Sequence, residues 1–383
     1  MRIAYVTESF PPDVNGVAHT AARIAEHLAS HGHEPLVIAP EPAGGLPRPD
    51  ASLGYPVVRI ASVALPLYAG FRVGLPSPRL RAAVAAHRAD LVHLAGPFVL
   101  GAAGCAAARQ LRLPMIASYS TDMAAYARAY HTGIAGQAAC WRRLRRIHNT
   151  ADRTLAPSTA TATELRAHGF ERVWQWGPGV DVGRFHPAKR SDRLRAELAP
   201  GGEAIVGYVG RLAAEKRVHL LAGVARLPGV RLVVVGGGPA EAAVRRALPT
   251  ALFLGQRQGD DLASLYASLD VFVHSGPHET FGNTLQEAAA SGLPVVAPAA
   301  GGPLDIVADG VTGFLVPPGD AGALTSAVST LVTNRALAAA QGRAARRGVL
   351  GRSWPARCDE LTGHYEALLE RAGAGQVPAG ARA

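Results

Sequence analysis

Short apolar runs alternate with amphipathic stretches along the first half of the chain. The stretch 17–31 repeats apolar residues with the period of a helix, and Gly32 follows as a C-terminal stop. Ser158 is placed to cap a second helix that ends near His168. The apolar runs are too short for helices and predict buried parallel strands at 3–6, 36–39, 57–60, 91–94, 115–118 and 154–156.

The second half of the chain repeats this alternation. Apolar runs predict strands at 205–209, 232–235, 252–254, 271–274 and 295–297. Helical patterns lie between or after them at 218–227, 240–248, 261–268 and 284–291. Repeated strand–helix–strand units predict a doubly wound parallel sheet in each half, and therefore an α/β protein with two Rossmann-like domains.

A stretch rich in Gly and Pro at 177–187 separates the two halves and is typical of a linker. We therefore expect an N-terminal domain at 1–178 and a C-terminal domain at 188–354. A C-terminal helix at about 355–371 is expected to complete the first domain, and the Gly/Ala-rich tail 372–383 is expected to be disordered. Ligands of such sheets bind at the carboxyl ends of strands, so the two domains should face one interdomain cleft.

The composition supports large cores and a reducing compartment. Of the 383 residues, 48% are hydrophobic and 18% are charged, which argues against disorder. No apolar run approaches the length of a membrane span, and the N-terminus resembles a strand rather than a signal peptide. The three cysteines, Cys105, Cys140 and Cys358, lie far apart and are expected to be reduced thiols of a cytoplasmic protein.

The net charge of +10 favours anionic ligands. The chain shows no signature of a nucleic-acid-binding motif, so nucleic acid is not an expected partner. The segment 141–146 combines Trp141 with four arginines. It is either a solvated helix face or a contact to anionic lipid or to an acceptor phosphate, which would place the protein at the inner face of a membrane.

The first candidate site is the segment 209–216. A strand ends, Gly210 turns the chain, and the cations Arg211 and Lys216 follow at the mouth of the expected cleft. Only two of the 39 basic residues are lysines, which makes the position of Lys216 informative. Two cations of this kind suit a diphosphate, whose negative charge grows as a sugar leaves it. The alternative is a surface salt bridge between Glu215 and a neighbouring arginine.

The second candidate site is the segment 278–287. Glu279 lies in the loop after the strand 271–274, and Glu287 lies two turns into the next helix. The helix N-terminus between them, at 282–284, offers amide N–H groups to a phosphate. The two carboxylates would then accept hydrogen bonds from hydroxyl groups, Glu279 from the transferred sugar and Glu287 from a ribose. The alternative is that Glu279 complements the helix dipole and Glu287 is a surface residue.

Together, the two segments resemble those of family-4 glycosyltransferases of the GT-B fold, which carry a Gly-Arg…Glu-Lys segment and a Glu-x7-Glu motif in the C-terminal domain. The resemblance covers nearly the whole chain and includes 11–16, 179–187 and 300–305. It implies a metal-independent transferase that retains the anomeric configuration and needs no cofactor besides its nucleotide diphosphate sugar. It also implies that the cations bind the donor diphosphate and the acids bind its sugar and ribose.

Within the family, the chain is most similar to actinobacterial GDP-mannose-dependent α-mannosyltransferases. Residues 8–17, 93–101, 119–122, 151–159 and 278–282 carry this similarity. It implies transfer of a hexose, with mannose and GDP-mannose favoured, to a lipid, glycan or natural-product hydroxyl. A UDP-sugar donor is the alternative within the family. Outside it, a GT-B epimerase or phosphorylase and a non-catalytic nucleotide-sugar binding protein remain open.

The resemblance also assigns residues to the two sides of the cleft. The loop at Asn15 and Gly16 would reach the donor from the first domain. The expected donor-binding residues are Gly16, Gly210, Arg211, Lys216, Glu279, Phe281, Gly282, Asn283, Thr284 and Glu287. The expected catalytic residues are Arg211, Lys216, Glu279 and Asp122, and the acceptor side would hold Ser120, Asp122 and Tyr126. Many relatives carry a histidine where this chain has Ser120, so no catalytic histidine is assigned there.

No metal site is expected from the sequence. The chain has no Asp-x-Asp, P-loop or His-Glu-x-x-His motif. His27, His31 and His33 have a spacing that metal sites use, but no carboxylate partner is evident nearby in the sequence. Stabilisation of the leaving phosphate is therefore assigned to side-chain cations.

Overall fold

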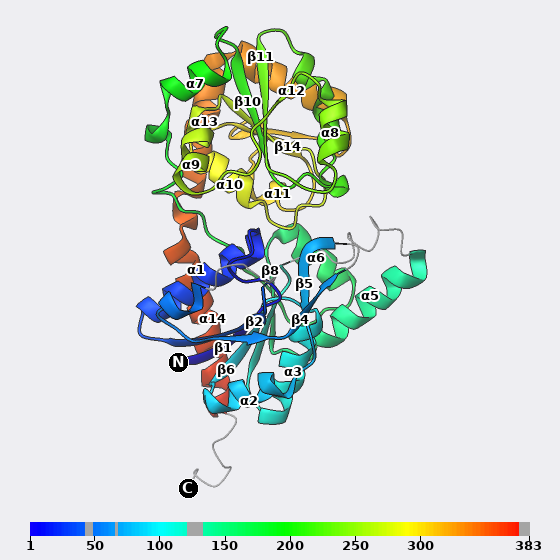
Figure 1. Cartoon of the computed structure of the whole chain (residues 1–383), viewed down its shortest axis with the longest axis vertical. Coiled ribbons are helices and arrows are strands. Elements are labelled where there is room, and N and C mark those ends of the chain that lie inside the picture. The colour runs from blue at the N-terminus through cyan, green and yellow to red at the C-terminus, as the bar shows by residue number, and fades with distance from the viewer. Residues whose placement is uncertain (43–48, 66–67, 121–132, 375–383) are drawn as a thin grey trace.

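The computed structural model describes residues 1–42, 49–65, 68–120 and 133–374, which form two lobes joined at one seam (Figure 1). The first lobe is built on a seven-stranded sheet with the order β3-β2-β1-β6-β7-β8-β9, in which all paired strands are parallel. Its strands are β1 (Arg2–Val6), β2 (Glu34–Pro40), β3 (Val57–Ile60), β6 (Leu91–Leu94), β7 (Met115–Ser118), β8 (Arg153–Ala156) and β9 (Val173–Gln175).

The second lobe is built on a six-stranded parallel sheet with the order β12-β11-β10-β13-β14-β15. Its strands are β10 (Ala204–Val209), β11 (Val230–Val235), β12 (Leu252–Phe253), β13 (Val271–Val273), β14 (Val295–Pro298) and β15 (Gly313–Val316). In both sheets the chain runs outward from a central strand, returns, and continues on the other side. This is the Rossmann order, and it places a crevice next to β1 and next to β10.

Helices cover both faces of each sheet (Figure 1). Those of the first lobe are α1 (Gly16–Ser30), α2 (Pro78–Ala86), α3 (Val99–Leu111), α5 (Gly133–His148) and α6 (Thr159–Ala167). Those of the second are α7 (Asp192–Leu198), α8 (Glu241–Ala247), α9 (Gly259–Ser268), α10 (Asn283–Ala290), α11 (Pro303–Ile306), α12 (Ala321–Thr333) and α13 (Arg335–Val349). Short 3₁₀ helices, which include η3 (Ala214–Lys216), η4 (Val218–Ala222) and η5 (Val224–Arg226), connect several of these elements.

The last helix, α14 (Trp354–Ala374), begins at the seam and runs back along the first lobe (Figure 1). Its residues Trp354, Cys358, Leu361 and Tyr365 are buried in the same apolar cluster as Ile24 of α1. The position of the seam and the return of α14 support the predicted domain boundaries at 178 and 188, which stay a prediction. Residues 375–383 lie outside the described residues, and with them most of the expected tail.

The elements predicted from periodicity are found, with one error of type. The stretch 218–227 forms the 3₁₀ helices η4 and η5 instead of an α-helix. Gly223 lies between them and packs closely against Thr325 of α12, since a Cβ atom there would lie 2.3 Å from Thr325 Oγ1. The sequence analysis did not identify β9, β15 or the antiparallel pair β4 (Ser62–Leu65) and β5 (Tyr68–Gly74).

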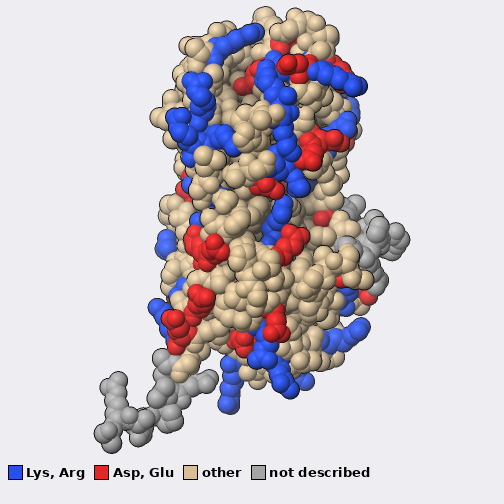
Figure 2. Space-filling model, turned by 90° about the vertical axis from the view of Figure 1, so that its left-hand side faces the viewer, with Lys and Arg blue, Asp and Glu red and all other residues tan. Residues whose placement is uncertain are grey.

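Charge on one side of the molecule is mixed. Figure 2 views the side on which α1, α7 and α9 lie, and it shows basic side chains interspersed with acidic ones over both lobes. Among the ion pairs of the described residues are Arg23 with Asp181 and Lys189 with Asp260. The net positive charge is therefore not gathered into one continuous basic surface on this side.

Candidate active site

Two loops of the second lobe meet at the crevice of its sheet, as the strand order requires. Gly210 and Arg211 directly follow β10, and Lys216 ends the 3₁₀ helix η3. Glu279 lies in the loop between β13 and α10. Because β10 and β13 are neighbours in the sheet, their carboxyl ends bring these loops together. Lys216 Nζ lies 2.5 Å from Glu279 Oε2, so the structure joins the two segments that the sequence singled out.

The ion pair is largely shielded from water, since each side chain is 19% exposed. Burial alone would raise the pKa of Glu279, but Lys216 and His274 beside it outweigh that effect and lower the pKa. Glu279 is therefore a carboxylate at neutral pH and accepts hydrogen bonds. An ammonium and a carboxylate held side by side can bind adjacent parts of one ligand, a phosphate oxygen and a hydroxyl group.

His274 is a third polar residue at this point, and it was not among the residues predicted from the sequence. Its imidazole is buried, and its Nε2 lies 3.5 Å from Glu279 Oε2, while neither ring nitrogen has a hydrogen bond. Burial lowers the pKa of His274 to about 4, so the ring is neutral at pH 7. The signal in the sequence was a polar residue directly after the apolar strand β13, in the loop that also carries Glu279.

The loop that carries Glu279 is held by a neighbouring glycine turn after β14. The Gly302 N–H donates to the Glu279 carbonyl oxygen at 2.7 Å. Gly301 has a φ of +64°, and a Cβ atom there would lie 2.3 Å from the same oxygen. Both glycines are thus required by the close approach of two backbones. These contacts involve only the backbone of Glu279, and they fix the position from which its carboxylate extends.

The N-terminus of α10 lies opposite the first lobe. Gly282, with a φ of +106°, precedes the helix, and Asn283 and Thr284 open it. A Cβ atom at Gly16 would lie 3.0 Å from Asn283 Nδ2, so the loop before α1 reaches across the cleft to this helix. The Asn15 side chain caps α1 by accepting from the N–H groups of Val17 and Ala18. Backbone amides at the start of α10 therefore face the space between the lobes, where an anion would be stabilised.

Glu287 lies on α10 at a deeper position of the second lobe. Tyr266 donates its hydroxyl hydrogen bond to Glu287 Oε2 at 3.0 Å. Burial raises the pKa of Glu287 to about 7, although this hydrogen bond lowers it in part. The carboxyl group is therefore poised between its two protonation states at neutral pH. Tyr266, which orients it, was not identified from the sequence.

Glu279 lines a pocket that lies between the two lobes. It has a volume of about 160 Å³, and Tyr119, Thr161 and Glu164 line it on one side. His278, Glu279, Thr280 and Gly301 line it on the other. Glu279 thus faces a space that residues of both lobes line.

One acidic residue of the second lobe fastens the lobes together. Asp305 Oδ2 accepts the Thr159 N–H at 2.6 Å and the Gln175 Nε2–H at 3.0 Å. Thr159 opens α6 and Gln175 ends β9, so both donors belong to the first lobe. These contacts hold the lobes in the arrangement in which Gly16 faces Asn283.

The remaining predicted residues occupy different places. The Phe281 ring packs at the seam, where a Cβ atom at Gly177 would lie 2.4 Å from its Cε2 atom. Ser120 donates its hydroxyl hydrogen bond to the Ala95 carbonyl oxygen at 2.7 Å. Asp122 and Tyr126 lie outside the described residues, and their expected roles stay predictions.

Comparison with known proteins agrees with this architecture. The family "Glycosyltransferase Family 4" matches residues 14–184, and "Glycosyl transferases group 1" matches residues 190–348. A GDP-mannose-dependent alpha-mannosyltransferase of Mycobacterium tuberculosis is 49% identical over 97% of this chain and 98% of its own. One from Corynebacterium glutamicum is 43% identical over 96% of this chain and 89% of its own. The crystal structure of Anabaena HepE with UDP superimposes with a TM-score of 0.79 at 23% identity, over 96% of this chain and 100% of that one.

Two Rossmann-like lobes with these matches define a sugar-transferring enzyme of the GT-B architecture. The chain belongs to glycosyltransferase family 4. The fold class and the family resemblance inferred from the sequence are confirmed. The roles of the individual site residues stay predictions.

Proposed function

We propose that this protein transfers mannose from GDP-mannose to a hydroxyl group and retains the anomeric configuration. The observation that carries this proposal is the 43–49% identity, over nearly the whole chain, with enzymes named as GDP-mannose-dependent alpha-mannosyltransferases. No comparable observation favours a UDP-sugar donor, an epimerase, a phosphorylase or a binding protein without activity.

The proposed roles follow from the positions of the charged groups. Lys216 and Arg211 bind the donor diphosphate, together with the amides at the start of α10. Glu279 accepts hydrogen bonds from the mannose hydroxyls, because the ammonium of Lys216 beside it keeps it ionised. Glu287 accepts hydrogen bonds from the ribose. The contact of Lys216 with Glu279 supports a site in which phosphate and sugar lie next to each other.

In the proposed reaction, the bond between the mannose C1 and the diphosphate oxygen breaks while C1 bonds to the acceptor oxygen on the same face. The leaving diphosphate oxygen takes the proton of the acceptor hydroxyl, so the products are the mannoside and GDP. Preorganised cations stabilise the charge that develops on the leaving group. We propose that Lys216 and Arg211 supply this stabilisation without a metal ion.

We further propose that the acceptor is presented at the cytoplasmic face of a membrane. The side chains of Arg142, Arg143, Arg145 and Arg146 on α5 are exposed, and such a basic helix is attracted to anionic lipid. Within the described residues, no helix has the length and apolar character needed to span a bilayer. A lipid acceptor is thus favoured over a soluble glycan or a small molecule.

A product-release assay tests the donor. Purified protein is incubated with GDP-mannose or with UDP-glucose, with and without a mixed lipid extract, and the released nucleoside diphosphate is quantified. GDP release that depends on the extract supports the proposal. Release of UDP but not GDP would favour the UDP-sugar alternative, and interconversion of the sugar without nucleotide release would favour an epimerase.

A further inference from the structure

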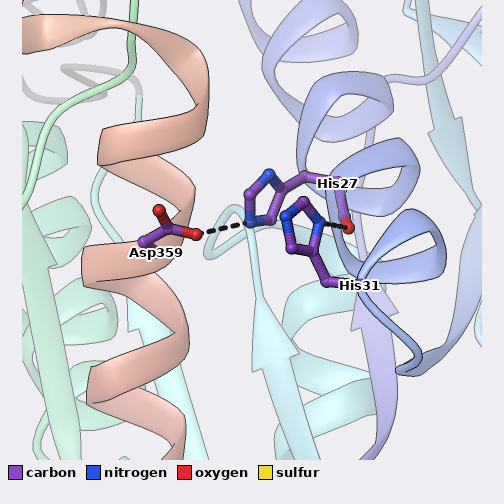
Figure 3. Close-up of side chains that lie close together, drawn as sticks. All are labelled: His27, His31 and Asp359. Carbon is purple, nitrogen blue, oxygen red and sulfur yellow. Dashed lines mark hydrogen bonds and ion pairs between the residues drawn. The ribbon is translucent and has the colours of Figure 1, made fainter.

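Three metal-ligating side chains from two helices converge on the side of the first lobe (Figure 3). His27 lies in the last turn of α1, His31 caps that helix, and Asp359 lies in the second turn of α14. One ligand atom of each residue lies within 4.8 Å of the other two. The sequence offered the histidines without a carboxylate partner, and the fold supplies that partner by packing α14 against α1.

The hydrogen bonds of the cluster indicate which ring nitrogen of each histidine could bind a cation. His31 Nδ1 lies 2.8 Å from the His27 carbonyl oxygen and must carry the proton, because a carbonyl oxygen only accepts. The lone pair of His31 is therefore on Nε2. A backbone carbonyl that fixes the tautomer and the orientation of a ring is the usual support of a metal-bound histidine.

The contact between His27 and Asp359 offers the second nitrogen. His27 Nε2 lies 3.0 Å from Asp359 Oδ1, and the two atoms share one proton. A cation can replace that proton, with the neutral ring of His27 then carrying its own proton on Nδ1.

We propose that His27, His31 and Asp359 form a binding site for a divalent transition-metal ion of the Zn²⁺, Ni²⁺ and Cu²⁺ group. Two imidazoles and one carboxylate suit these ions, whereas Mg²⁺ and Ca²⁺ prefer oxygen ligands. Tetrahedral ligands of Zn²⁺ lie roughly 3.4 Å apart. The rings of His27 and His31 are stacked with centroids 3.9 Å apart, so an ion would bind after the exposed Asp359 side chain rotates and the His31 ring tilts about its bond to the His27 carbonyl oxygen. Water completes the coordination.

The site would act on the fold and not on the chemistry of transfer. Helix α1 carries Gly16 at its other end, and the rings of His19 and Trp354 pack edge to face where α14 leaves the seam. An ion bound between His27 and Asp359 would join the two helices a second time, farther from the cleft. It would therefore stabilise the docking of α14 on the first lobe.

Direct titration tests the site. The full chain without an affinity tag is freed of metal with a chelator, the chelator is removed, and Zn²⁺ is titrated against a chromogenic competitor. We expect one saturable Zn²⁺ site per chain, with affinity about tenfold lower or worse in both H31A and D359N. His219 is exposed and lies on η4 of the other lobe, so H219A is the matched control and should bind like the unaltered protein.

Zn²⁺ should raise the Tm of the unaltered protein by roughly 2–4 °C, but not that of D359N.

Electron paramagnetic resonance with Cu²⁺ gives a readout that a loss of stability would not produce. The spectrum should show two nitrogen ligands in the unaltered protein and in H219A, and one in H31A. Either of two results would overturn the proposal: H31A and D359N that titrate like H219A, or the same Cu²⁺ spectrum in all variants.

Discussion

Lys216 of η3 forms its ion pair with Glu279 of the loop after β13, with a distance of 2.5 Å between Nζ and Oε2. The other lysine of the chain, Lys189, forms a similar pair with Asp260, but Asp260 is 78% exposed. The same interaction thus occurs once in the cleft and once on the surface, and the two lysines can be compared directly.

Lys216→Ala and Glu279→Ala are each expected to reduce turnover at least about 100-fold. The reason is that Lys216 stabilises charge that develops only as the diphosphate leaves, and Glu279 orients the sugar that departs from it. Initial rates of GDP release at saturating donor measure the effect. Lys189→Ala is the matched control and should stay within about twofold of the unaltered protein. Near-normal turnover in both cleft variants would remove the site assignment.

The KM for the donor should depend on pH, because the protonation state of Glu287 changes near neutral pH. Burial raises the pKa of Glu287 to about 7, and only the ionised form is a strong acceptor for ribose hydroxyls. The KM for GDP-mannose is therefore expected to fall as the pH rises from 6 to 8. Glu287→Gln should have a higher KM at pH 8 and should lose this pH dependence. A pH profile of KM that is the same in both proteins would contradict the ribose assignment.

The same carboxyl group should affect stability in the opposite direction. A folded-state pKa raised above the unfolded value of 4.5 stabilises the fold at low pH, and this contribution is lost as the pH rises through about 7. Glu287→Gln is thus expected to raise the Tm at pH 8 relative to the unaltered protein, and less so at pH 5. Thermal unfolding at the two pH values measures the difference. A lower Tm of the variant at pH 8 would show that the ionised carboxylate is not destabilising.

Gly16→Ala should impair activity without impairing the fold. The new Cβ atom would lie 3.0 Å from Asn283 Nδ2 and would obstruct the approach of the α1 loop to α10. A loss of about ten- to 100-fold in kcat/KM is expected, because small displacements at the reacting groups have large effects on rate. The Tm should not fall, since alanine is favoured over glycine in a helix. Gly54→Ala, where a Cβ atom meets nothing within 4 Å, is the control for both measurements.

Asp305→Ala is expected to loosen the contact between the lobes. It removes the acceptor of two hydrogen bonds donated by Thr159 and Gln175. Small-angle X-ray scattering should then show a larger radius of gyration, and kcat should fall about tenfold because closure excludes water and completes the site. Gln175→Ala in the Asp305→Ala background should add little, since the two residues share one bond. An unchanged radius and rate would show that other contacts suffice.

Removal of metal ions should leave transfer intact. If Lys216 and Arg211 neutralise the leaving diphosphate, the rate in excess EDTA should stay within about twofold of the untreated rate. The assay compares EDTA-treated protein with and without added Mg²⁺ or Mn²⁺. Loss of activity that either ion restores would show that the donor is bound through a metal.

The two doubly wound parallel sheets and the two chemical segments were predictable because their signals are local. Each strand is a short apolar run, and the segments around Lys216 and Glu279 stand directly after such runs. The helix predicted at 218–227 was wrong in type, since this stretch forms two 3₁₀ helices, and its Gly223 packs against α12, which is remote in sequence. Tyr266 and His274 were missed because each becomes a site residue only through its neighbour, Glu287 or Glu279.

Contacts between distant parts of the chain could not be predicted. The pairing of Asp359 with His27 depends on the return of α14 to the first lobe, which no local pattern announces. The reach of Gly16 to Asn283 depends in the same way on how the lobes are placed. A single polar residue on a helix gives no indication of what faces it until the packing of that helix is known.

The return of α14 also sets an order of events during synthesis. The apolar cluster that holds Ile3 and Ile24 is completed by Cys358, Leu361 and Tyr365, which leave the ribosome only after the entire second lobe. The lobe that is made first therefore cannot complete this cluster until α14 has followed the second lobe out of the ribosome, while the lobe made second has its whole sheet at hand earlier. Until α14 has been made, the nascent first lobe would expose an incomplete apolar face. Chaperones are therefore expected to act on this part of the protein.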